Sequence, residues 1–210
     1  MIHIYRSELS CVELSSCFQD LPWNRKERIV RLKTHEAKLR VAGTYLLLKE
    51  ALQKEGVDGI ELVEHENGKP YLKDFGLYFS LSASGNLLVC AVSDSEVGAD
   101  CQRIGVVDER TAERFYSMEE RKIVAKSAEP GLVSALIWTR KESLLKFTGE
   151  GLSVLLDGFS VFPDRRISYK GDSYNMYDYM LDDYVLSVCS QQKCFPETIH
   201  RLDIGKKDLI

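Results

Sequence analysis

Two apolar stretches of the sequence, L-L-V-C-A-V-S at 87–93 and Y-V-L-S-V-C-S at 184–190, decide the fold class. Short apolar runs that are rich in β-branched residues are typical of buried strands. The first run follows a strand-like segment at 77–82 across the turn signal S-G-N at 84–86, and the second follows a strand-like segment at 174–181. The sequence therefore predicts an antiparallel pair of strands in each half of the chain.

A helix precedes the strands in each half. Residues 33–55 carry apolar side chains at helical spacing and are followed by Gly56, and a second long helix begins at Pro130 and runs to about Thr148, before Gly149. A further helix is expected over 119–126, with Ser117 as its N-cap and Glu120 three residues on. The N-terminus is expected to form a strand in which Ile2 and Ile4 alternate with His3 and Tyr5. Other strands are expected at 60–65, 70–73, 158–162 and 166–170.

This order of elements predicts an α+β fold of two similar lobes, each with helices packed on a small antiparallel sheet. We expect the lobes to span residues 1–100 and 101–210. A groove between two lobes is a common place for a ligand site.

The composition of the chain excludes some functions. Hydrophobic residues make up 44% and charged residues 29% of 210 positions, which is typical of a globular protein. The formal net charge of −4 does not favour nucleic-acid binding, which needs concentrated Lys and Arg. A local basic stretch can still bind phosphate, and one is formed by Arg25, Lys26, Arg28, Arg31, Lys33, Lys38 and Arg40.

No apolar run approaches the roughly 18 residues that a membrane span needs, and the N-terminus does not resemble a signal peptide. We therefore expect a cytoplasmic protein that does not bind membranes. The six cysteines form no C-x-x-C pair and no zinc-ligand pattern, so buried, reduced thiols are the interpretation.

The stretch W-T-R-K-E-S-L-L-K at 138–146 is the first candidate functional motif. Trp138, Glu142 and Lys146 are four residues apart and share one face of the predicted helix. A carboxylate and an ammonium one turn apart are typical either of a reactive site or of an exposed ion pair that only aids solubility.

Three further motifs are weaker when each is taken alone. Asp100 follows V-G-A at a strand end, where a carboxylate can bind Mg²⁺ or form a turn, and Gly98 permits close approach of a ligand. The G-K-P-Y turn at 68–71 makes Lys69 project, so that its ammonium could meet a phosphate as a point charge, although alone it is an ordinary hairpin turn. The stretch F-S-L-S-A-S-G at 79–85 offers hydroxyl donors to an anion, although serine-rich turns are often only turns.

The order and spacing of these motifs closely resemble those of the large single-chain 4′-phosphopantetheinyl transferases, the surfactin-synthetase-activating type. The likeness continues through G-E-G-L-S-V-L-L-D-G-F-S-V at 149–161. It covers residues 33 to 161 well and the flanks loosely.

The resemblance implies a fold, a reaction and a site. Family members are two pseudo-symmetric lobes that bind coenzyme A and Mg²⁺ in the groove between them. They move phosphopantetheine from coenzyme A to a serine of an acyl- or peptidyl-carrier protein and release 3′,5′-ADP. The residues implied for metal binding are Asp100, Glu142 and Gln102; those for catalysis are Glu142, as candidate base, and Lys146; and those for coenzyme A binding are Lys69, Pro70, Ser82, Ser84, Lys38, Arg40 and Lys146.

Two positions depart from the family pattern. Gln102 stands where the family often has a second acid, and Ala83 stands where it often has a histidine that contacts the coenzyme. A silent coenzyme A-binding relative is therefore one alternative to an active transferase, and a structural or interaction domain is another. A monomer is sufficient because both lobes lie in one chain, and the segment 103–127 is a candidate surface for carrier docking.

Overall fold

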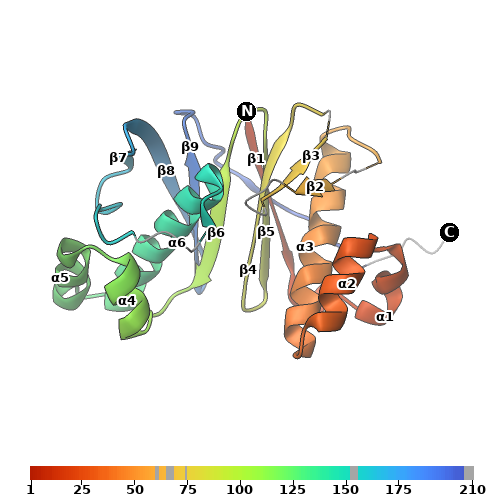
Figure 1. Ribbon diagram of the computed structural model, residues 1–210, viewed down its shortest axis with the longest axis horizontal. Coiled ribbons are helices and arrows are strands. Elements are labelled where there is room, and N and C mark those ends of the chain that lie inside the picture. The colour runs from red at the N-terminus through yellow and green to blue at the C-terminus, as the bar shows by residue number, and fades with distance from the viewer. Residues whose placement is uncertain (60–61, 65–68, 74, 152–155, 206–210) are drawn as a thin grey trace.

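The computed structural model describes residues 1–59, 62–64, 69–73, 75–151 and 156–205. Two four-stranded sheets stand next to each other, and a long helix packs on each of them (Figure 1). This arrangement confirms the predicted α+β fold with helices packed on small sheets.

The first sheet has the strand order β10-β1-β5-β4. Its strands are β10 (Ile199–Arg201), β1 (Ile2–Glu8), β5 (Leu87–Ser93) and β4 (Tyr78–Ser84). The sheet is not purely antiparallel as predicted, because β1 pairs in parallel with β10. Helix α3 (His35–Lys54) covers one face, where Tyr5 and Cys90 enter a core with Leu48 and Leu52.

The second sheet is antiparallel and has the order β6-β9-β8-β7. Its strands are β6 (Gly98–Arg103), β9 (Tyr184–Ser190), β8 (Asp172–Leu181) and β7 (Arg166–Tyr169). Helix α6 (Pro130–Thr148) packs on β6 and β9, and Gly149 ends it in the left-handed conformation that glycine favours. Helices α4 (Glu109–Phe115) and α5 (Met118–Lys126) flank α6.

The remaining described elements lie mainly around α3. They are η1 (Leu9–Cys11), α1 (Leu14–Cys17), η2 (Phe18–Asp20), α2 (Trp23–Arg31), β2 (Leu62–Glu64) and β3 (Pro70–Leu72). Helix α2 packs on α3, and β2 pairs with β3.

The two sheets meet back to back through a third apolar cluster. It includes Ile4 and Val89 from the first sheet and Ala99 and Val188 from the second. Both sheets are therefore buried on two faces, which explains why 87–93 and 184–190 are continuously apolar. The expected division at 100/101 stays a prediction; this position lies within β6, and β10 returns to pair with the first sheet.

The predicted strand at 158–162 is wrong. These residues form a turn and irregular chain, and side chains of α5 and α6 bind their backbone. Glu120 accepts from the Val161 N–H, and Lys141 donates to the Phe159 carbonyl. Parts of the predicted strand at 60–65, of the G-K-P-Y turn at 68–71 and of the 149–161 motif lie outside the described residues.

All six cysteines are free, as expected, and Cys90 and Cys189 are fully buried. The expectation of buried thiols is wrong for Cys194, which is exposed, and for Cys11, which is half-buried. No helix in the described part of the chain combines the length and the hydrophobicity that crossing a bilayer requires.

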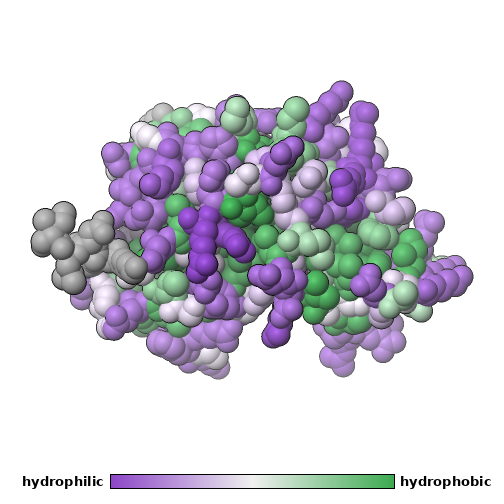
Figure 2. Space-filling view, turned by 180° about the vertical axis from the view of Figure 1, so that it is seen from behind, coloured by the Kyte–Doolittle hydropathy of each residue, from purple (hydrophilic) through white to green (hydrophobic). Residues whose placement is uncertain are grey.

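Large apolar side chains are exposed at separate places, among them Trp23 and Val30 on α2, Met118 on α5 and Met180 on β8. Figure 2, which shows the molecule from behind, has apolar areas interrupted by many hydrophilic side chains.

Candidate active site

The candidate site forms where α6 crosses β6 at very short range. A Cβ at Gly98 would lie 1.9 Å from the Ser143 carbonyl oxygen and 2.6 Å from the Phe147 nitrogen. Only glycine allows this approach. The sequence suggested that Gly98 admits a ligand, but the neighbour is the backbone of α6. The contact brings the last turns of α6 against β6. Asp100 lies within this strand, which begins at Gly98, so the prediction of a strand end at this point is wrong.

Lys146 and Asp100 form an ion pair at this crossing. Lys146 Nζ lies 2.7 Å from Asp100 Oδ1, and it also donates to the carbonyl oxygens of Leu81 and Ala99, each at 3.1 Å. The Ser82 hydroxyl donates to the same Asp100 oxygen at 2.8 Å. Asp100 is buried, whereas the Lys146 side chain keeps 29% exposure. The ammonium is therefore held by the protein while part of it still faces solvent.

Glu142 lies one helical turn before Lys146. Its Oε1 atom is buried and has no hydrogen-bond partner among the described residues. Burial, and secondly the Asp100 carboxylate, raise the pKa of Glu142 to about 7, while Lys146 opposes this rise. An unsatisfied buried acceptor costs about 1–3 kcal/mol of stability, and a buried carboxyl with a raised pKa beside a cavity is typical of a functional site.

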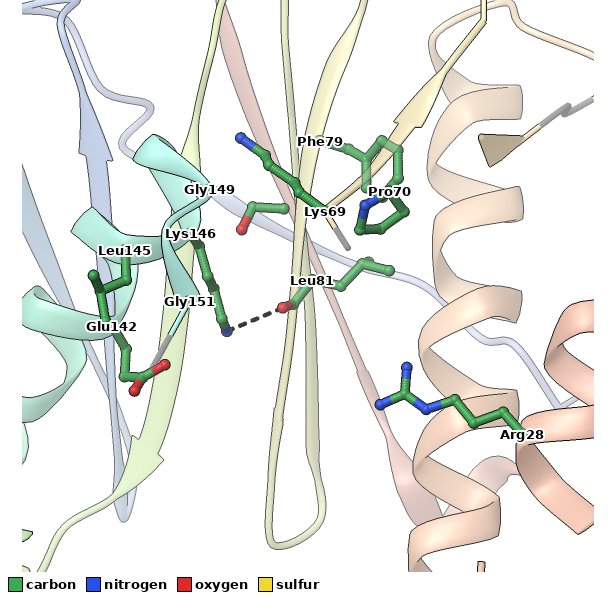
Figure 3. Close-up of a pocket in the computed structure, with 11 residues that line it drawn as sticks. Arg28, Lys69, Pro70, Phe79, Leu81, Glu142, Leu145, Lys146, Gly149 and Gly151 are labelled. Carbon is green, nitrogen blue, oxygen red and sulfur yellow. Dashed lines mark hydrogen bonds between the residues drawn. The ribbon is translucent and has the colours of Figure 1, made fainter. Parts of the chain in front are cut away.

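A cavity of about 490 Å³ opens beside these groups. Glu142 and Lys146 reach it from α6, Lys69 from the chain before β3, and Arg28 from α2 (Figure 3). The complete lining comprises Arg28, Lys69, Pro70, Phe79, Ser80, Leu81, Glu142, Leu145, Lys146, Gly149 and Gly151. Three cations and an apolar wall formed by Pro70 and Phe79 suit an anionic ligand that also has an apolar part.

The oxygen ligands available near the cavity fit a small hard cation. Glu142 offers a carboxylate in the cavity lining, and Asp100 offers a second one beside Lys146. Gln102, whose amide oxygen accepts from the Ser84 hydroxyl at 3.2 Å, follows two residues along β6 and is not among the described residues that line the cavity. No cluster of three or more His, Cys, Asp or Glu placed to bind a metal occurs in the described ranges. Two carboxylates are nevertheless enough for Mg²⁺, which keeps several waters and takes further oxygens from a phosphate substrate. The partnerless oxygen of Glu142 is consistent with such a ligand.

Of the residues predicted to bind coenzyme A, Lys69, Pro70 and Lys146 line the cavity. Lys69 also contacts Glu96 Oε2 at 2.6 Å and the Phe147 carbonyl oxygen at 3.1 Å. Ser82 and Ser84 are buried, each at 7% exposure, and their hydroxyls bind β6. They are not among the cavity-lining residues of the described chain, and their predicted contact with the coenzyme stays a prediction.

The basic region contributes to the cavity through Arg28. Neither Lys38 nor Arg40 is among the described residues that line it. Arg40 instead pairs with Glu36 at 2.6 Å. The packing of α2 on α3 decides which cation of the basic stretch reaches the cavity, and the predicted contacts of Lys38 and Arg40 with the coenzyme stay predictions.

The two residues before Glu142 are buried in structural ion pairs. Lys141 Nζ lies 2.7 Å from Glu120 Oε2, and Arg140 contacts Asp178 at 2.6 Å. Lys141 also donates to the Leu156 carbonyl oxygen at 2.6 Å. Burial lowers the pKa of Lys141, and the charge of Glu120 opposes that change. Within this motif, Arg140 and Lys141 therefore serve packing, whereas Glu142 and Lys146 line the cavity.

The fold and the site define a class: a two-sheet α+β protein with paired carboxylates and a lysine beside a cationic cavity. A sequence model of the 4′-phosphopantetheinyl transferase superfamily matches residues 96–189, which include Asp100, Glu142 and Lys146. Among similar curated proteins, gsp of Aneurinibacillus migulanus is 32% identical over 136 residues, which cover 63% of this chain and 56% of the relative.

Two other relatives are covered more fully. Sfp of Bacillus subtilis (strain 168), a 4′-phosphopantetheinyl transferase, is 32% identical over 67% of each protein. The transferase ffp of Bacillus subtilis is 31% identical over 163 residues, which are 73% of this chain and 72% of the relative. The chain belongs to the 4′-phosphopantetheinyl transferase superfamily.

Proposed function

We propose that this protein transfers the 4′-phosphopantetheine group of coenzyme A to a serine of an apo acyl- or peptidyl-carrier protein. The reaction depends on Mg²⁺ and releases 3′,5′-ADP. The observation that carries the proposal is the cluster of Asp100, Glu142 and Lys146 at the β6–α6 crossing, beside a cavity with two more cations. Family membership supports the same reaction.

The charges around the cavity suit the coenzyme. Its diphosphate and 3′-phosphate are anionic, and Arg28, Lys69 and Lys146 supply positive charge from three different elements. Pro70 and Phe79 offer an apolar surface for the uncharged parts of the molecule. Lys binds a phosphate as a point charge, while Arg can bind two oxygens at once.

In the proposed reaction, the carrier serine oxygen forms a bond to the β-phosphorus, and the bond from this phosphorus to the bridging oxygen breaks. Glu142 accepts the serine proton, and a pKa of about 7 suits a base that works near neutral pH. Lys146 stabilises the negative charge that develops on the diphosphate oxygens. The leaving group departs as 3′,5′-ADP, and its negative charge is met by the cations of the cavity.

The predicted metal ligands are Asp100, Glu142 and the amide oxygen of Gln102. When bound there, Mg²⁺ would supply electrostatic stabilisation of the phosphate oxygens. The role of Asp100 is to present its carboxylate to the cation, with its orientation fixed by Ser82 and Lys146.

A direct test incubates the protein with coenzyme A, Mg²⁺ and several apo carrier proteins, and weighs each carrier by mass spectrometry. We expect a gain of one phosphopantetheine group in the wild type and a large loss in Glu142→Gln. Glu129→Gln is the matched control, because Glu129 is exposed at the start of the same helix and makes no capping hydrogen bond. No gain with any carrier would contradict the proposal.

A silent coenzyme A-binding protein is the second candidate, and it is favoured by Gln102 and Ala83. An amide is a weaker Mg²⁺ ligand than a carboxylate, and alanine offers the coenzyme no hydrogen bond. Calorimetry that detects coenzyme A binding in a protein without turnover would favour this second candidate over the transferase.

A further inference from the structure

Three serines on one face of β4 join the first sheet to the second. Ser80, Ser82 and Ser84 alternate along β4, so their side chains point the same way, and all three are buried. Each hydroxyl accepts a hydrogen bond from a backbone N–H of β6. The pairs are Ala99 N to Ser80 at 2.9 Å, Cys101 N to Ser82 at 3.1 Å and Arg103 N to Ser84 at 3.1 Å.

The three hydroxyls differ in what their own protons bind. Ser80 donates to the Ala99 carbonyl oxygen at 3.4 Å, and Ser84 donates to the Gln102 side chain at 3.2 Å. Ser82 donates to the Asp100 carboxylate at the shorter distance of 2.8 Å. Of the three serines, Ser82 therefore binds a charged group, and such hydrogen bonds are the stronger kind.

We propose that Ser82 is a positioning residue that fixes the Asp100 carboxylate for cation binding. This inference rests on the proposed function, in which Asp100 is a metal ligand. The Ser82 hydroxyl is itself held by the N–H of Cys101, the residue next to Asp100, so one hydroxyl binds both the backbone and the carboxylate at this point.

Two donors share one oxygen atom of Asp100, and they differ in how firmly they orient the carboxylate. Asp100 Oδ1 accepts from Ser82 and from Lys146 Nζ, which lies at 2.7 Å. Without the hydroxyl, Lys146 alone orients the carboxylate. The ammonium sits on a long flexible side chain that keeps 29% exposure, whereas Ser82 is short and 7% exposed. The rigid partner is therefore Ser82, and removing it leaves the carboxylate free to follow Lys146.

The test compares Ser82→Ala with Ser80→Ala. Both variants remove one buried serine and leave one N–H of β6 without its acceptor, so both melting temperatures are expected to fall. The fall is larger in Ser82→Ala, which also loses a hydrogen bond to a carboxylate. Mn²⁺ binding is then measured by electron paramagnetic resonance without coenzyme A. We expect Ser82→Ala to bind Mn²⁺ at least about 10-fold more weakly than the wild type, as is typical when a partner of a metal ligand is lost. Ser80→Ala is expected to bind Mn²⁺ like the wild type.

Two further variants sharpen the result. Ser82→Cys fills nearly the same space with a weaker donor and should give an intermediate Mn²⁺ affinity, even if Ser82→Ala folds poorly. In an Asp100→Asn background, Ser82→Ala should cause no additional loss of Mn²⁺ binding, because the two side chains act as one unit.

Equal Mn²⁺ affinity in Ser82→Ala and Ser80→Ala would overturn the positioning role. So would a Ser82→Ala variant that binds Mn²⁺ normally and raises only the KM for coenzyme A, since that result assigns Ser82 to the coenzyme. A wild-type protein that binds Mn²⁺ through Ser82 and Asp100 but modifies no carrier would leave positioning intact and contradict the transferase.

Discussion

Lys146 ties the two sheets together at Asp100. Its Nζ contacts Asp100 Oδ1 at 2.7 Å and the Ala99 carbonyl oxygen at 3.1 Å on β6, and it also contacts the Leu81 carbonyl oxygen at 3.1 Å on β4. The ammonium therefore contacts a strand of each sheet, and Lys146 also lines the cavity. The position of this charge depends on how α6 packs against β6, and not only on the conformation of the Lys146 side chain.

Replacing Lys146 with methionine should abolish most of the transfer activity. The substitution keeps much of the apolar stem and removes the positive charge at the cavity. We expect kcat to fall about 100-fold to 1,000-fold, the loss typical of removing one electrostatic stabiliser of a transition state. The rate is measured from the mass of the carrier over time at saturating coenzyme A.

Lys49→Met provides the control, because Lys49 is exposed on α3 and is not among the residues that line the cavity. It should keep the wild-type rate. If Lys146→Met modified the carrier at the same rate as Lys49→Met, the positive charge of Lys146 would not contribute to catalysis.

Glu142 should make the metal-free protein less stable as pH rises. Its carboxyl has a raised pKa of about 7 in the folded state, so the folded state holds a proton that the unfolded chain releases near pH 4.5. The stabilising effect of this proton is complete below about pH 4.5 and is lost as pH increases through 7. The whole change amounts to at most about 3 kcal/mol.

The measurement is urea unfolding of the wild type and Glu142→Gln from pH 5 to pH 8 in the presence of a chelator. The difference between their free energies of unfolding should move in favour of Glu142→Gln as pH rises. A difference that stays constant over this interval would contradict the raised pKa.

The sequence was sufficient to predict helix α6, which bears Glu142 and Lys146, but not strand β6, which bears Asp100. Helix α6 begins at Pro130 and ends at Thr148 as expected, and the Ser117–Glu120 capping box starts α5. These features are local, since a cap or a helical period is set within a few residues. The proximity of Glu142 and Lys146 also follows from helical spacing, whereas their meeting with Asp100 was implied by the family resemblance.

What the sequence did not reveal depends on contacts between distant segments. The stretch 158–162 resembles a strand, but Glu120, Arg140 and Lys141 bind its backbone groups, and strand pairing is not needed to satisfy them. The inward position of Arg28 and the serine contacts between β4 and β6 arise in the same way. No local pattern distinguishes a serine that binds a neighbouring strand from one in a turn.

Gly98→Ala should separate the helix from the strand. The added Cβ would overlap the Ser143 carbonyl oxygen of α6, and a backbone group cannot turn aside as a side chain can. We expect a loss of about 1–3 kcal/mol or more in unfolding free energy. The activity per folded molecule should fall as well, because Lys146 moves away from Asp100.

Gly158→Ala is the matched control, since a Cβ there meets no atom of the described residues within 4 Å. It should leave both stability and transfer nearly unchanged. If Gly98→Ala were as stable and active as Gly158→Ala, the close contact of α6 with β6 would not be what assembles the site.

The buried pair of Lys141 and Glu120 should be the most sensitive ion pair to break. Their side chains are 1% and 0% exposed, so Lys141→Met leaves a carboxylate in the interior without its cation. Breaking a buried pair in this way costs about 3–5 kcal/mol. Adding Glu120→Gln should recover part of this loss, because it removes the buried charge. The recovery is incomplete because the single amide oxygen can accept from the N–H of Ser117 or of Val161, whereas the carboxylate accepts from both. Arg31→Met, which breaks an exposed pair with Glu27, should cost less than about 1 kcal/mol. Urea unfolding of the wild type and these three variants measures the differences, and equal losses in Lys141→Met and Arg31→Met would mean that the interior pair contributes no more than a surface one.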